Sequence, residues 1–95
     1  MIIVSVRDTV ADYFLPPYFA RNGDHASRMF ISSLGDSFVH RDDFDLYAIG
    51  TFDENTGEIT SQQPEKILAG LSIAPTLDPR MPPAAPSTKI QDPIL

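Results

Sequence analysis

The sequence predicts a small α+β fold: one domain over residues 1–73 and a disordered tail over residues 74–95. Three observations lead to this prediction. The chain of 95 residues has room for one small domain. Strand-like and helix-like patterns alternate over residues 1–73. Six of the nine prolines stand in residues 74–95, and proline lacks an amide proton and has a fixed φ, which favours a disordered tail.

The first quarter of the chain is predicted to hold one strand and one loop. Residues 2–6 are mostly β-branched, which is typical of a strand. Residues 15–19 contain Pro16 and Pro17, which exclude both a helix interior and a central strand. We therefore expect an ordered aromatic–proline loop there.

The clearest helix is predicted over residues 24–34. Asp24 suits the N-cap and Gly35 the left-handed C-terminal cap. Apolar side chains recur at spacings of three and four, which places them on one face of a helix; they are Ala26, Met29, Phe30 and Leu34.

A β-hairpin is predicted to follow. Residues 44–52 alternate as a strand, residues 53–57 have turn chemistry, and residues 58–60 return as the partner strand. Pro64 is acceptable in the first turn of a helix, so a short helix is predicted over residues 65–71.

The alternation along residues 44–52 predicts two faces. A domain this small with no tryptophan needs its phenylalanines for a core. The predicted core side is Phe44, Leu46, Ala48 and Phe52, and the opposite side is Tyr47 and Ile49.

Composition narrows the classes of function. The net charge of -6 and the pI of about 4.5 are unlike most nucleic-acid binders, which carry a basic surface. Charge alone therefore favours protein–protein interaction. Cysteine is absent and there are two histidines, so we expect no disulfide, metal or other cofactor. A thin core is commonly supported by oligomerisation, and we expect a homodimer.

Catalytic patterns are lacking, and we expect that the protein is not an enzyme. No nucleophile motif occurs, and His40 is best interpreted as a solvated loop residue. The acids Asp42, Asp43 and Asp45 are interpreted as a loop followed by the polar side of a strand rather than as a cation site. No segment approaches the roughly 20 apolar residues of a membrane span, so a soluble protein with no membrane partner is expected.

Aromatic and basic residues are interleaved, as in proteins that stack single-stranded DNA on exposed rings. For Tyr18 and Tyr47, burial in the core and exposure on a binding face are equally open alternatives. The candidate nucleic-acid-binding residues are Arg7, Arg21, Arg28, Arg41, Tyr18 and Tyr47.

Several stretches together resemble one family, the small nonstructural protein of gokushovirus-type microviruses, which are single-stranded-DNA phages. The resemblance covers roughly residues 4–70. Its most specific part is Asp43-Phe44-Asp45-Leu46-Tyr47, completed by Thr56-Gly57-x-Ile59; the other parts are Val6-Arg7-Asp8, Ala11-Asp12-Tyr13-Phe14 with Pro16-Pro17, and Ala26-x-Arg28-x-Phe30.

This resemblance implies a phage early protein that acts in the host cytoplasm and is commonly labelled DNA-binding. Arg7 and Arg28 belong to the family pattern, and their contact with DNA is our hypothesis. The first hypothesis is therefore a protein that binds single-stranded DNA during genome synthesis or packaging. The alternative is an acidic adaptor that binds a viral or host replication protein through its surface or its tail, which ends in Ile90-Gln-Asp-Pro-Ile-Leu95.

Overall fold

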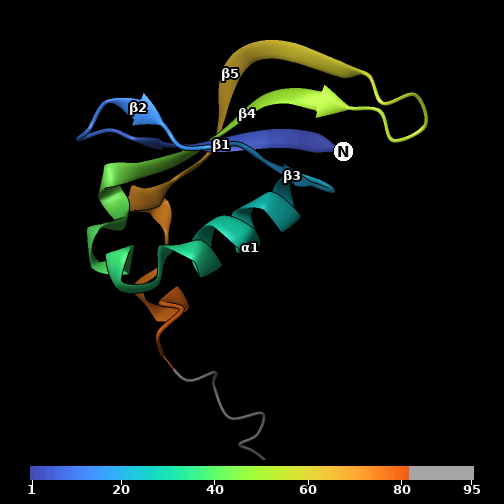
Figure 1. Ribbon diagram of the computed structural model, residues 1–95. Helices are drawn as coiled ribbons and strands as arrows, with labels where there is room; N and C mark the ends of the chain where they lie inside the picture. The colour runs from blue at the N-terminus through green and yellow to red at the C-terminus, as the bar shows by residue number, and fades with distance from the viewer. Residues whose placement is uncertain (82–95) are drawn as a thin grey trace, which may run out of the picture.

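The computed structural model describes residues 1–81 and has two layers, an antiparallel sheet and a helical layer on one side of it (Figure 1). The predicted α+β class is confirmed. The elements in chain order are β1 (Ile2–Asp8), β2 (Tyr13–Phe14), β3 (Tyr18–Ala20), α1 (Gly23–Leu34), the 3-10 segment η1 (Gly35–Asp43), β4 (Phe44–Phe52), β5 (Ile59–Ala69) and two short 3-10 turns, η2 (Gly70–Ser72) and η3 (Pro75–Leu77).

The sheet has the strand order β2-β1-β4-β5, and β3 pairs with the same edge of β1 as β2 does. Every pairing is antiparallel. The predicted loop over residues 15–19 is wrong in part, because β3 begins at Tyr18. Pro16 and Pro17 separate β2 from β3, so the double proline interrupts a sheet edge, which is the position where proline is tolerated.

Helix α1 confirms the predicted helix, with three differences. Asn22 and not Asp24 is the N-cap: its Oδ1 accepts a hydrogen bond from the His25 amide at 2.9 Å. Met29, expected on the apolar face, is exposed. Gly35 has a positive φ of 51°, as expected, but its ψ of -125° lies outside the left-handed helical region, so the predicted left-handed cap is wrong in part.

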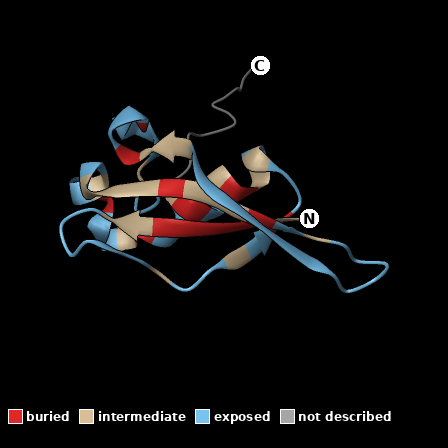
Figure 2. Cartoon of the chain, turned by 90° about the horizontal axis from the view of Figure 1, so that it is seen from above, coloured by how far each residue is buried: buried red, intermediate tan, exposed pale blue. Residues whose placement is uncertain are grey.

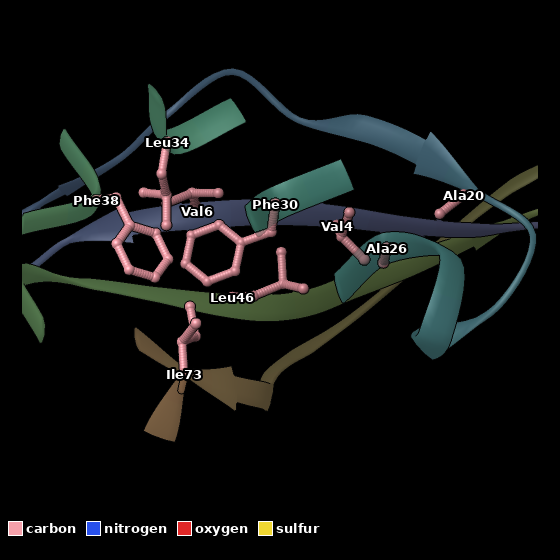
Figure 3. Packing of buried hydrophobic residues seen from close by; sticks show 9 residues of the cluster. All are labelled: Val4, Val6, Ala20, Ala26, Phe30, Leu34, Phe38, Leu46 and Ile73. Atoms are coloured by element: carbon pink, nitrogen blue, oxygen red, sulfur yellow. The ribbon is translucent and has the colours of Figure 1, made fainter. Parts of the chain in front are cut away.

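The core lies between α1 and the sheet face that is turned towards it. Figure 3 shows Phe30 of α1 packed between Val6 and Leu46 of the two central strands, and Phe30 and Leu46 are fully buried. Figure 2 shows the same pattern, with buried segments in the centre of the sheet and an exposed β4–β5 hairpin. The cluster consists of Val4, Val6, Ala20, Ala26, Phe30, Leu34, Phe38, Leu46 and Ile73.

A β-bulge in β4 overturns one predicted orientation. β4 carries one extra residue, Ile49, between the residues that pair with Ile3 and Val4 of β1. One extra residue moves every later side chain to the opposite face of the sheet. Phe52, predicted to face the core, therefore lies on the other face, where its ring contacts Phe19.

The predicted helix over residues 65–71 is wrong. Most of this segment belongs to β5, which runs from Ile59 to Ala69 and pairs with β4. Pro64 lies inside this edge strand, next to a shift in the β4–β5 register. Edge strands and bulges are the places in a sheet where proline is accepted, so Pro64 marks an edge and not a helix start.

The predicted tail is ordered at its beginning. Pro75–Leu77 form η3, and the Arg80 side chain pairs with Asp78 at 2.6 Å. Residues 82–95 of the predicted tail lie outside the described residues, and so does the Ile90–Leu95 segment. Within residues 1–81, no helix has both the length and the apolar character needed to cross a membrane.

Candidate nucleic-acid interface

The sheet face that points away from α1 is the candidate site, and we call it the open face. Paired residues on neighbouring strands share a face of the sheet. Ser5 pairs with Tyr47, and Arg7 pairs with both Phe14 and Asp45. In Figure 1 the helical segments all lie on the other side of the sheet. Ser5 is buried among its neighbours, whereas Phe14 is 39% exposed and the Arg7 side chain 30% exposed.

The first aromatic pair on the open face is Phe14 with Tyr47. Their ring centroids are 5.5 Å apart and the planes meet at 74°, an edge-to-face contact. A cation accompanies each ring: the Arg7 guanidinium lies 5.4 Å from the Phe14 centroid, and the Lys66 ammonium lies 5.8 Å from the Tyr47 centroid. β1, β2, β4 and β5 each contribute one of these four residues.

The second aromatic pair is Phe19 with Phe52, at 5.2 Å between centroids and 79° between planes. Phe19 pairs with Ile3 of β1, whereas Phe14 pairs with Arg7. Four residues of strand separate the two pairs, which corresponds to about 13 Å along β1. Phe14 and Phe19 are 39% and 40% exposed, so both pairs present ring surface to solvent.

Each basic side chain on or beside the open face has a carboxylate partner. Arg7 pairs with Asp12, and the Lys66 ammonium lies 3.4 Å from a carboxylate oxygen of Asp45. At the Phe52 end of the face, Arg21 lies 3.6 Å from Glu54 in the β4–β5 turn.

The six candidate residues are not all brought together. Arg7 and Tyr47 lie on the open face. Tyr47 is a member of the first aromatic pair, and Arg7 is one of the two cations beside it. Arg21 lines a shallow hollow with Phe52 at the far end of that face. The other three, Tyr18, Arg28 and Arg41, belong to the helical side.

Two of these three residues have specific contacts there. The Tyr18 hydroxyl donates to the Ala26 carbonyl of α1 at 3.2 Å, and burial raises the pKa of Tyr18 to about 12. Arg41 donates to the Ile73 carbonyl at 2.9 Å and lies over the Phe38 ring. Arg28 is exposed on α1.

Four residues of the open face were not predicted as site residues: Phe14, Phe19, Phe52 and Lys66. The clustering of aromatic residues around the double proline is a signal in the sequence for the first two. Phe52 requires knowledge of the bulge in β4. Lys66 requires the pairing of β5 with β4, which the predicted helix concealed.

One acid and one histidine accept backbone hydrogen bonds that support the fold. The Asp45 carboxylate accepts from the Gly70 amide at 3.2 Å, and His25 Nδ1 accepts from the Arg21 amide at 3.0 Å. Over residues 1–81, no three side chains of the metal-binding types gather into a group. The open face offers aromatic rings and cations.

Comparison with known proteins gives one match. No curated protein and no solved structure matches the chain at a significant level. The family model described as phage ORF5 protein matches residues 1–73, a segment that ends at Ile73, the last buried residue of the core. The chain therefore belongs to the phage ORF5 protein family.

Proposed function

We propose that this phage protein binds single-stranded DNA on its open face during genome synthesis or packaging, as its resemblance to gokushovirus nonstructural proteins implies. The observation that carries the proposal is the pair of edge-to-face aromatic contacts on the sheet face that points away from α1, accompanied by Arg7 and Lys66. Unpaired bases stack on such rings, and the cations approach the phosphates.

The geometry suits a short single strand. Stacking of one base on an aromatic side chain contributes about 1–3 kcal/mol. Two stacking positions about 13 Å apart along β1 would hold a segment of several nucleotides. Aromatic rings accept any base, so the expected binding is tolerant of sequence.

The acidic pI is compatible with this proposal because some of the acids lie away from the rings. Asp53 and Glu54 line the hollow next to Phe52, but Asp24 and Asp36 belong to the helical side. Their long-range repulsion of DNA is screened over a Debye length of about 8–10 Å at physiological salt.

The test is fluorescence anisotropy of a labelled oligo(dT) titrated with the full chain. Phe14→Ala removes one stacking ring, and we expect it to weaken binding about tenfold. Tyr13→Ala is the matched control, because Tyr13 is the neighbouring aromatic residue in β2, is 51% exposed and alternates to the other face of the sheet. Tyr13→Ala should leave the affinity unchanged.

Circular dichroism of both variants separates loss of binding from loss of fold. Equal affinities for the wild type, Phe14→Ala and Tyr13→Ala would exclude the open face as the interface. A wild-type protein that binds no oligo(dT) at low salt would contradict the function itself.

The adaptor function is the second candidate, and one observation on the helical side favours it. Leu71 and Val39 are 77% and 56% exposed, and they line one hollow with Arg41 and Asp42. A partner such as a viral or host replication protein could cover these apolar groups. Leu71→Ser should then abolish capture of a purified replication protein, whereas Phe14→Ala should preserve it.

A further inference from the structure

We infer that the carboxylate partners of the open-face cations make the site select unpaired strands over duplex DNA. The inference rests on the proposed function and specifies its substrate class. Because carboxylates already pair with these cations, phosphates contribute less to the free energy of binding. Most of the affinity must therefore come from base stacking.

The first argument is the pairing of each cation. Arg7 is bound by Asp12, Lys66 by Asp45 and Arg21 by Glu54. A phosphate that approaches one of these cations must displace a carboxylate that is already there. The displaced acid remains nearby and takes up a cation from solution. This uptake offsets the counterion that the DNA releases.

The second argument is that two of these acids are held in place. The turn before Asp12 is closed by Asp8, whose carboxylate accepts from the Val10 and Ala11 amides at 3.1 and 3.0 Å. The Asp12 amide donates to the Asp8 carbonyl at 2.8 Å. Asp45 is only 14% exposed at its side chain and is anchored by the Gly70 amide. The backbone of this turn places Asp12, whose side chain is 77% exposed, beside Arg7, and the Gly70 amide holds the Asp45 carboxylate near Lys66.

The third argument is the accessibility of the bases. In a duplex the bases are paired and stacked on one another, so Phe14 and Phe19 have no base face to contact. Duplex DNA presents mainly its phosphates, and the cations that would bind them already have carboxylate partners. A single strand offers both groups, and the rings can contribute their full stacking energy.

The decisive variant is Asp12→Asn, which frees Arg7 while it keeps the size of the side chain. Asp12 has a φ of 64°, and asparagine is well tolerated in this left-handed region. Asp24→Asn is the matched control, because it changes the net charge equally at an exposed position of α1. The wild type and both variants are titrated against oligo(dT) and against a duplex of equal length at four salt concentrations.

We expect Asp12→Asn to steepen the slope of log K against log salt for oligo(dT) by about 0.7, the value for one additional phosphate contact on a single strand. Its affinity for the duplex should rise by a larger factor than its affinity for oligo(dT), which reduces the selectivity. Asp24→Asn should change neither the slope nor the ratio of the two affinities.

The outcomes separate the two proposals. If the wild type binds oligo(dT) but Asp12→Asn and Asp24→Asn have the same slope and selectivity, this inference is overturned and the proposed function stands. If the wild type binds duplex as tightly as oligo(dT), the inference is likewise overturned. If the wild type binds neither at the lowest salt, the proposed function has failed.

Discussion

Tyr18 is the residue whose ionisation differs most clearly between the folded and unfolded chain. Its hydroxyl donates to the Ala26 carbonyl, and burial raises its pKa from 10.0 to about 12. The raised pKa means that the folded protein holds this proton more tightly than the unfolded chain does. The resulting stabilisation is fully present below pH 10 and is lost as the pH rises towards 12.

The loss of stability expected at alkaline pH should therefore depend on the Tyr18 side chain. The free energy of unfolding from urea titrations should fall between pH 10 and pH 12 in the wild type, and Tyr18→Phe should show a smaller fall over the same range. Tyrosinate absorbance provides a second measurement, because the ionisation near pH 12 should be missing in Tyr18→Phe. If Tyr18→Phe retained that step, the assignment would be wrong.

Tyr47 and Phe52 show what residue patterns can and cannot predict about the site. Strict alternation along β4 correctly places Tyr47 on the other face of the sheet from the core residue Leu46. The same rule misplaces Phe52, because the bulge at Ile49 reverses the alternation. A bulge depends on how β4 meets β1, and that information is not contained in either strand by itself.

Among the elements, η1, β4 and η2 meet at a junction where their backbones lie in close contact around Gly70. Gly70 of η2 is buried, and a Cβ atom there would overlap the carbonyl oxygens of Arg41 and Phe44. Neither oxygen belongs to a flexible side chain, so the backbone itself would have to move.

Gly70→Ala is therefore expected to destabilise the fold strongly, by roughly 2–4 kcal/mol, which is at the upper end of single substitutions. Gly23→Ala is the control. A Cβ at Gly23 would meet only the Ile67 side chain, at 3.9 Å. Thermal unfolding of the two variants should show a large drop for Gly70→Ala and little change for Gly23→Ala. Equal effects would contradict this view of the junction.

The elements differ in how far their own sequence determines them. β1 is rich in β-branched residues, and α1 and β4 carry periodic apolar patterns; all three predicted elements are present, although the bulge in β4 changes the orientation of Phe52. β5 carries no such pattern: residues 59–66 are all exposed, so only pairing with β4 makes them a strand. Lys66 became visible as part of the open face only through this pairing, and β2 and β3 likewise depend on β1.

The whole molecule is a sheet with two unlike sides. One side buries the core under α1, and its polar surface includes Arg28 and Arg41. The other side is the open face, with its two aromatic pairs. Protein and DNA should therefore meet on one side only.

A titration of 15N-labelled protein with oligo(dT) tests this at the scale of the whole molecule. We expect the shifts of amide signals to concentrate in β1, β2 and β4, around Arg7, Phe14 and Tyr47, and the signals of α1 to stay unchanged. Shifts centred on Arg28 would place the interface on the helical side and would contradict the proposed site.

The position of Ile73 has a consequence for how the chain folds during its synthesis. Ile73 is 4% exposed within a core otherwise built by residues 4–46, and its carbonyl accepts from Arg41. A nascent chain still attached to the ribosome therefore lacks one wall of its core until this late residue has emerged. The contacts that close the domain are also distant in sequence, which slows folding. We therefore expect the core to close in one late step, once Ile73 has emerged, rather than element by element along the chain.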